Sequence, residues 1–245
     1  MAAATVVCFA GAAQADLIAD NGFGTADLPP VGLTYTTPFG DMAIIDGLPL
    51  GTTIQIDASM HSFTYNQFSP PGVMSFPPNA TGRQPGGTLG GEQAASDAVF
   101  TWPLIGTGSL AGYNRLIQIP ISHEIHMAPR VNGDPVQSFA TDFFRGFGQI
   151  TGDPDFDLLR FTGGTDFGLP SPGQTWLTTA GPGLWDMGSY YDLTYRIDFV
   201  GAPGGLLAGM SGSTTGTVRL NIVPAPGVAL GMLTCGTLLG LRRRR

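Results

Sequence analysis

Apolar and polar residues alternate one by one along several stretches of this chain. The clearest stretch is 191–199 (YDLTYRIDF), in which every odd-numbered residue is apolar or aromatic and every even-numbered residue is polar. A period of two is typical of a β-strand that buries one face and leaves the other in water. Residues 217–222 alternate in the same way, and the segment 201–209 between the two stretches is rich in Gly. The pattern predicts an antiparallel hairpin with a long loop.

The first half of the chain contains similar patterns. Residues 54–60 and 113–122 alternate, although Pro120 lies inside the second stretch. Proline has no amide hydrogen to donate, so it favours an edge strand or a bulge at this point. Shorter candidate strands cover residues 33–37, 98–102, 137–148, 156–162 and 174–179. Between the two ends of the chain we find no helix-period apolar stripe longer than two turns, and the absence of Lys removes a residue that solvent-facing helices use.

Short strands separated by Gly- and Pro-rich turns predict an all-β fold. We expect a single antiparallel β-sandwich domain, jelly-roll-like in arrangement, over residues 16–222. The Pro- and Gly-rich segment 69–91 contains few core residues, so we expect a long surface loop there and not a linker between domains. A short hydrophobic helix is expected to follow the domain, within residues 223–245.

Charge and cysteine usage narrow the function classes. All 18 acidic residues lie between Asp16 and Asp198, and the body from Asp16 to Val223 contains only 7 Arg, which gives it a formal charge of −11. Such a surface repels phosphate backbones, so nucleic acid is not an expected partner. The two cysteines, Cys8 and Cys235, lie in the apolar terminal segments. The body therefore has neither a disulfide nor a thiolate metal site.

The N-terminal segment has features of an export signal. Residues 1–15 (MAAATVVCFAGAAQA) are apolar and small, and they end in Ala13-Gln14-Ala15, the A-x-A pattern of a signal peptidase site. Cleavage there would leave Asp16 as the new terminus. The run is short and has no positive residue before it, so we expect the true start to lie upstream of Met1. The alternative is a first helix or strand that packs into the fold.

The C-terminal segment combines an apolar run with a basic end. Residues 222–241 are uncharged, and twenty helical residues would span roughly 30 Å, about the thickness of the hydrocarbon layer. Pro224 and Pro226 suit a helix start, so the helix proper is expected to begin near Pro226. The four arginines that follow predict a cytoplasmic anchor that leaves the body outside. The alternative, a buried C-terminal helix, leaves the arginines without a role.

The order of these parts resembles a known sorting signal. Val223-Pro224-Ala225-Pro226, the apolar run Gly227 to Leu241, and Arg242, Arg243, Arg244 and Arg245 resemble the PEP-CTERM sorting domain of bacterial exosortase substrates. Ala225 replaces the central Glu that is usual in the family. The resemblance implies export, retention in the inner membrane, and recognition and cleavage near Pro224–Pro226 by an exosortase. It also implies delivery to the cell surface or matrix of bacteria that make exopolysaccharide.

Two groups of residues are candidates for metal binding. Asp153, Asp155 and Asp157 are spaced like the carboxylates of extracellular Ca²⁺ sites, which predicts either a weak structural Ca²⁺ site or an acidic turn before the strand 156–162. On a strand, Glu124 and His126 share one face, and they could bind a metal together with His61. The alternative for this second group is a set of polar residues on an edge strand. No other cofactor is predicted.

Aromatic residues outside the alternating core pattern are candidates for sugar contact. Trp185 lies in a Gly- and Pro-rich segment, and Tyr190 is out of phase with the buried positions around Tyr191, so both are expected to be exposed. Trp102 and Trp176 are candidates for the same platform, and ordinary core packing is the alternative for all of them. Nucleophile-elbow, Walker and dinucleotide motifs are absent.

These observations predict a non-enzymatic protein of the cell envelope or extracellular matrix. Its role would be structural or adhesive and linked to exopolysaccharide, with signal peptidase and an exosortase as processing partners. One alternative is a lectin-like carbohydrate-binding module that uses Trp185 and Tyr190. Another is a secreted hydrolase, for which the 18 carboxylates offer no identifiable catalytic pair.

Overall fold

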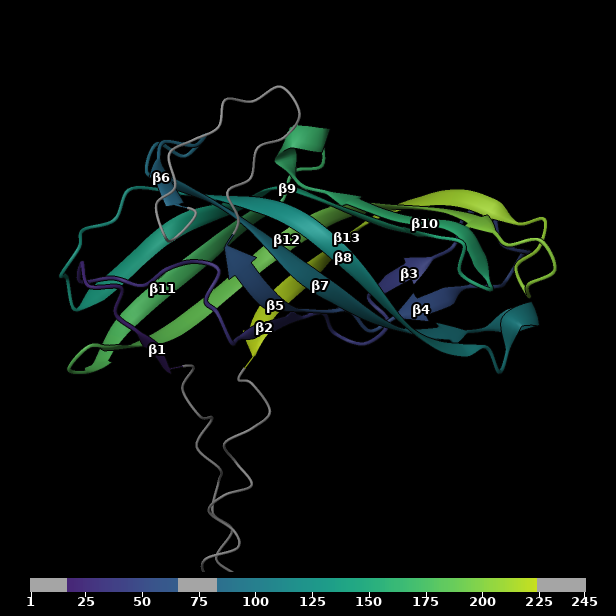
Figure 1. Cartoon of the computed structure of the whole chain (residues 1–245), viewed down its shortest axis with the longest axis horizontal. Coiled ribbons are helices and arrows are strands. Elements are labelled where there is room, and N and C mark those ends of the chain that lie inside the picture. Colours follow the sequence, from purple (N-terminus) through teal and green to yellow (C-terminus); the bar gives the residue numbers. More distant parts are fainter. Residues whose placement is uncertain (1–16, 66–82, 224–245) are drawn as a thin grey trace, which may run out of the picture.

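The computed structural model describes residues 17–65 and 83–223, which form thirteen β-strands and two short 3-10 helices (Figure 1). The strands of the first half are β1 (Leu17–Ala19), β2 (Thr34–Thr36), β3 (Met42–Ile44), β4 (Ile54–Ile56), β5 (Ser59–Tyr65), β6 (Arg83–Pro85) and β7 (Glu92–Gly106). Those of the second half are β8 (Asn114–Met127), β9 (Val136–Thr151), β10 (Phe156–Gly163), β11 (Pro172–Gly181), β12 (Leu184–Gly201) and β13 (Ser211–Val223). The 3-10 helices are η1 (Gly108–Leu110) and η2 (Thr165–Phe167).

The strands pair antiparallel throughout and form one continuous sheet that folds onto itself. From β9, hydrogen-bonded neighbours lead through β11, β12, β13, β2, β5, β7 and β8 back to β9. Strand β10 also joins β9 to β12, while β4 pairs with β7 and β3 pairs with β4. The predicted all-β antiparallel class is confirmed. The two halves of the sheet face each other across a single core, and strand pairings at their margins keep them connected.

Each strand predicted from the sequence overlaps at least one observed strand. The predicted hairpin is β12 and β13, paired from Tyr190 with Asn221 to Val200 with Ser211. The alternating stretch 54–60 is divided between β4 and β5. The expected surface loop 69–91 is interrupted by the short strand β6, which pairs with the start of β7. The signal peptide and the C-terminal helix that the sequence predicts lie outside the described residues.

Strand β8 shows how Pro120 acts within the sheet. The strand pairs with β7 along its whole length but with β9 only from Ile121 onward. Pro120 is therefore the last residue of β8 before the second neighbour begins. The predicted edge strand is right for the first half of β8, which pairs with β7, and wrong for the second half, which lies between β7 and β9.

A closed cycle of five aromatic side chains occupies one part of the core. Its members come from β2, β5, β8, β9 and β12, and they are Tyr35, Phe63, His123, Phe143 and Tyr191. Successive ring centroids lie 6.0, 5.6, 5.6, 6.1 and 5.6 Å apart around the cycle. These separations are typical of favourable aromatic pairs. The cycle therefore joins five different strands, from β2 near the start of the domain to β12 near its end.

His123 is the one ionisable nitrogen base in this cycle, and its environment keeps it uncharged. The residue is 2% exposed, and its ring stacks on Phe143 at an interplanar angle of 13°. Burial lowers the pKa of His123 from 6.5 to about 4, because a charged imidazole would lose its hydration among apolar rings. The hydroxyl of Ser96 is its polar neighbour, 3.3 Å from Nε2.

Replacing His123 by Phe should remove a pH-dependent part of the stability. In the unfolded wild-type chain this imidazole takes up a proton below pH 6.5, whereas in the folded protein it does so only near pH 4. The unfolding free energy therefore has its full value above pH 6.5, where His123 is neutral in both states. It falls by about 3 kcal/mol as the pH is lowered to 4. Urea unfolding between pH 4 and pH 7 measures it.

The variant His123→Phe keeps a flat ring in the cycle, so its unfolding free energy should vary less over this window than that of the wild type. His61→Gln is the matched control, because His61 hydrogen-bonds to Ser62 and Thr101 and is not in the cycle. The control should keep the wild-type slope. An unchanged slope in His123→Phe would show that another group causes the acid sensitivity.

Candidate functional site

The residues of the terminal sorting signals lie almost entirely outside the described part of the chain. Ala13, Ala15 and Asp16 precede it, and Pro224, Ala225, Pro226 and Arg242–Arg245 follow it. Val223, the first residue of the sorting pattern, is the last residue of β13. Among the residues that can be described, no helix is long and apolar enough to cross a membrane.

The described fold begins and ends at neighbouring positions along β12. Leu17 of β1 pairs with Asp186, while Asn221 near the end of β13 pairs with Tyr190. Both strands lie on the side of β12 that is opposite β11, because β11 also pairs with these β12 residues. The two junctions with the terminal segments are therefore on the same edge of the domain.

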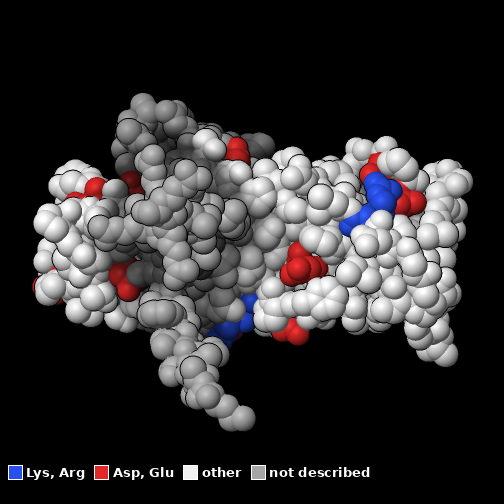
Figure 2. Space-filling model, turned by 90° about the horizontal axis from the view of Figure 1, so that it is seen from below, with Lys and Arg blue, Asp and Glu red and all other residues white. Residues whose placement is uncertain are grey.

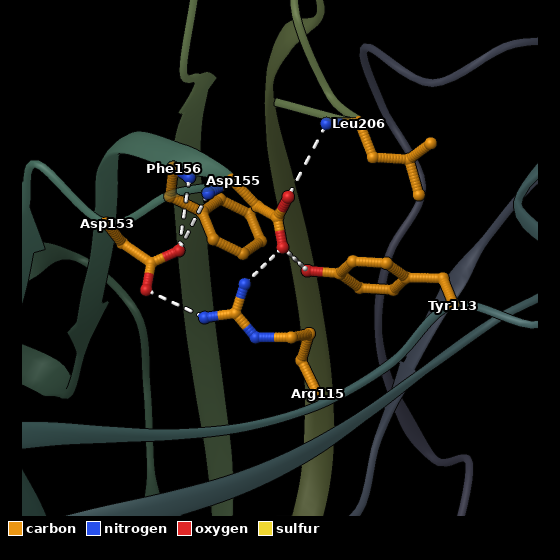
Figure 3. Close-up of polar contacts among 6 residues, drawn as sticks. All are labelled: Tyr113, Arg115, Asp153, Asp155, Phe156 and Leu206. Atoms are coloured by element: carbon orange, nitrogen blue, oxygen red, sulfur yellow. Dashed lines mark hydrogen bonds and ion pairs between the residues drawn. The ribbon is translucent and has the colours of Figure 1, made fainter. Parts of the chain in front are cut away.

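The acidic triplet predicted as a Ca²⁺ site holds an arginine instead (Figure 3). Arg115 of β8 places one guanidinium nitrogen 2.9 Å from Asp153 Oδ2 and the other against Asp155 Oδ2. The hydroxyl of Tyr113 donates to the same Asp155 oxygen at 3.3 Å. We refer to Tyr113, Arg115, Asp153 and Asp155 as the Arg115 clasp. Burial, followed by the charge of Asp155, raises the pKa of Tyr113.

Backbone amides occupy the remaining carboxylate oxygens of the clasp. Asp153 Oδ1 accepts hydrogen bonds from the amides of Asp155 and Phe156, and Asp155 Oδ1 accepts one from Leu206. Asp157 is exposed and does not join them. Within residues 17–65 and 83–223, no three carboxylate, imidazole or thiol groups are arranged to hold a metal ion. The clasp therefore ties β8 to the start of β10 and to the β12–β13 loop.

Glu124 and His126 share the outer face of β8, as predicted, but His61 is not near them. His126 Nε2 lies 3.0 Å from Glu124 Oε1, and Glu124 Oε2 forms an ion pair with Arg145 at 2.7 Å. The ring stacks on Phe144, with centroids 3.9 Å apart. His126 is buried, which corrects the alternative of a polar surface residue.

Thr88 completes a hydroxyl, imidazole and carboxylate series with His126 and Glu124. Its Oγ1 lies 2.9 Å from His126 Nδ1, and its backbone amide donates to the same nitrogen at 3.1 Å. An Nδ1 that accepts an amide hydrogen leaves Nε2 as the protonated nitrogen, which donates to Glu124. Because Nδ1 is already engaged, the series fastens the turn between β6 and β7 and does not provide a free base for the Thr88 hydroxyl.

Trp185 and Tyr190 do not form a common surface. Trp185 lies within β12, is 4% exposed and donates its indole N–H to Asp20 at 2.9 Å. Its predicted exposure is wrong, because β12 begins at Leu184 and continues the buried odd-numbered positions back to Trp185. Tyr190 has the opposite parity, so it lies on the outer face, where it is half-buried.

The outer face around Tyr190 presents a different tryptophan. Trp176 of β11 is 44% exposed, and its ring centroid lies 6.4 Å from that of Tyr190. Its pairing partner on β12 is Gly188, and a Cβ at that position would overlap the indole. The glycine therefore lets the indole lie against the sheet. The pair Gly188 and Tyr190, on the outer face of one strand, was the sequence signal that could have identified this site.

Polar side chains surround the two aromatic rings. Arg219 of β13 lies over the Tyr190 ring, 4.2 Å from its centroid, and makes two hydrogen bonds of 2.7 and 2.9 Å to Asp192. Gln174 Nε2 donates to Ser138 Oγ at 3.0 Å beside Trp176. We call this surface the Trp176 face, and its members are Ser138, Gln174, Trp176, Tyr190, Asp192 and Arg219. All six belong to β9, β11, β12 and β13 and point to the outer side of the sheet.

Replacing Arg115 by Met should destabilise the protein by about 2 kcal/mol or more, because it leaves two largely buried carboxylates without their cation. Asp153 and Asp155 are only 18% and 14% exposed. Arg219→Met is the matched control, since its pair with Asp192 is exposed and should contribute less than about 1 kcal/mol. Equal losses of unfolding free energy in the two variants would contradict the role given to the clasp.

Calcium provides a second measurement on the same residues. Adding millimolar Ca²⁺ to the wild-type protein should leave its unfolding temperature unchanged, because the clasp carboxylates already accept hydrogen bonds from Arg115, Tyr113 and backbone amides. A rise in unfolding temperature that is lost in Asp157→Asn would show that the triplet does bind the ion.

Comparison with known proteins finds no matching family model, no similar curated protein and no similar solved structure.

Proposed function

We propose that this chain is an exported, non-enzymatic β-domain protein of the cell envelope or extracellular matrix, sorted and cleaved by an exosortase. Its role is structural or adhesive, in contact with exopolysaccharide. One observation carries the proposal. The three-part pattern of prolines, apolar run and arginines begins at Val223, which is also where the last strand of the folded domain ends.

The position of the two junctions supports a tethered domain. The N-terminal and C-terminal ends of the described fold lie on the same edge of β12, so an anchor attached at Val223 holds the domain by one edge. The described residues supply one continuous core of their own, as a domain released from its anchor requires.

The processing steps follow from the order of the segments. Signal peptidase removes residues 1–15 after Ala15 during export. The apolar run Gly227–Leu241 then holds the protein in the inner membrane, with Arg242–Arg245 on the cytoplasmic side. An exosortase cleaves near Pro224–Pro226 and transfers the domain to the cell surface or matrix.

The polar clusters of the domain support a structural role over a catalytic one. The clasp carboxylates are neutralised by Arg115, and the His126 imidazole is held by the backbone of Thr88. Groups that are already paired in this way strengthen the fold, whereas catalysis needs a base or nucleophile that a substrate can reach.

Replacing Arg242–Arg245 with Ser should reduce membrane retention and processing in a bacterium that expresses an exosortase. The reason is that the arginines fix the orientation of the apolar run. Mass spectrometry of the mature termini, combined with cell fractionation, measures both effects. Arg196→Ser is the control for loss of positive charge, since Arg196 is an exposed arginine of the domain. Normal processing of the variant with Ser at positions 242–245, or an intact wild-type chain in the cytoplasm, would contradict the proposal.

A further inference from the structure

We infer that the Trp176 face binds a neutral polysaccharide by stacking a sugar ring on Trp176, beside Tyr190. This inference deepens the proposed function, on which it rests for the presence of polysaccharide around the protein. The face lies on the outer side of the β12–β13 hairpin and of its neighbour β11. In the part of the chain that the structure describes, Trp176 is 44% exposed.

Trp176 is held in a position that suits stacking. The indole occupies the space above Gly188, where any larger residue would displace it. Tyr190 follows at a centroid separation of 6.4 Å and an interplanar angle of 58°, so two aromatic surfaces lie in succession along the same face. Aromatic rings have few rotatable bonds, so little conformational entropy is lost when a ligand packs on them.

Arg219 fixes the second ring. Its guanidinium lies 4.2 Å from the Tyr190 centroid, and Asp192 holds it there through two hydrogen bonds. Tyr190 is thereby fixed in place before any ligand arrives. Gln174 and Ser138, which hydrogen-bond to each other beside Trp176, retain donor and acceptor capacity for sugar hydroxyls. Flat rings bordered by polar amide and hydroxyl groups match a sugar, which has apolar C–H faces and a polar rim.

The charges of the domain select an uncharged ligand. Every arginine whose side chain the structure describes lies within 4 Å of a carboxylate. In the face of the molecule shown in Figure 2, charged side chains are few and uncharged residues predominate. The body carries a formal charge of −11, so an anionic polymer would be repelled and would find no unpaired arginine among these residues. A neutral glycan meets neither obstacle.

Affinity electrophoresis of the full chain, purified in a mild detergent, tests the inference. The gels contain hydroxyethyl cellulose, a soluble β-1,3-glucan or dextran as neutral probes, and alginate as the anionic probe. The wild-type protein should be retarded by at least one neutral polymer and not by alginate. Trp176→Ala should weaken that binding at least tenfold, and Gly188→Val should weaken it as well, because its side chain displaces the indole.

Phe147→Ala is the matched control, because Phe147 is 43% exposed but lies nine residues from Ser138 along β9, about 30 Å away. This variant should bind like the wild type, and an unchanged unfolding temperature in Trp176→Ala shows that the domain is intact. Equal retardation of wild type and Trp176→Ala, retardation by alginate alone, or no retardation by any neutral polymer would each overturn the inference.

The terminal processing of the chain is measured separately, by mass spectrometry of cell-derived protein. Processed termini without glycan binding would remove the inference and leave the proposed sorting intact. Glycan binding by a chain with unprocessed termini would remove the sorting proposal and leave the Trp176 face.

Discussion

The cycle formed by Tyr35, Phe63, His123, Phe143 and Tyr191 is the contact on which the closed sheet depends. Each ring comes from a different strand, and each touches the next at a centroid distance of about 6 Å. Strands β2 and β12, which are far apart in sequence, are joined through Tyr35 and Tyr191. The cycle tolerates one imidazole only in its neutral form, so the same packing that closes the sheet also makes the fold sensitive to acid.

Closure of the sheet decides which residues remain for function. Once the odd-numbered positions of β12 are committed to the core, Trp185 is inside and Tyr190 is outside. The pairing of β11 with β12 then brings Trp176 beside Tyr190, and the pairing of β12 with β13 adds Arg219. The outer surface is thus a consequence of strand register and not of any local motif.

This dependence explains what the sequence could and could not predict. A period of two is a local property, so the hairpin β12–β13 was predictable from alternation, whereas the three-residue strands β1, β3 and β6 are too short to show it. The partner of the acidic triplet was not, because Arg115 lies 38 residues before Asp153 and reaches it through the folded sheet. Trp176 was recognisable only as one aromatic among several until the register placed Gly188 beneath it. The central position of the second half of β8 likewise depends on β9, whose pairing no local pattern reports.

The scarcity of positive charge connects the fold to its surroundings. The chain has no Lys, and the described arginines of the domain, Arg115 to Arg219, are all paired with carboxylates that stabilise strand contacts. The excess carboxylates repel other acidic surfaces, including further copies of this domain, over a screening distance of about 10 Å. Adhesion under such repulsion has to rely on short-range contacts that need no charge. Stacking on exposed aromatic rings and hydrogen bonds to hydroxyl groups are contacts of this kind, and the Trp176 face concentrates both.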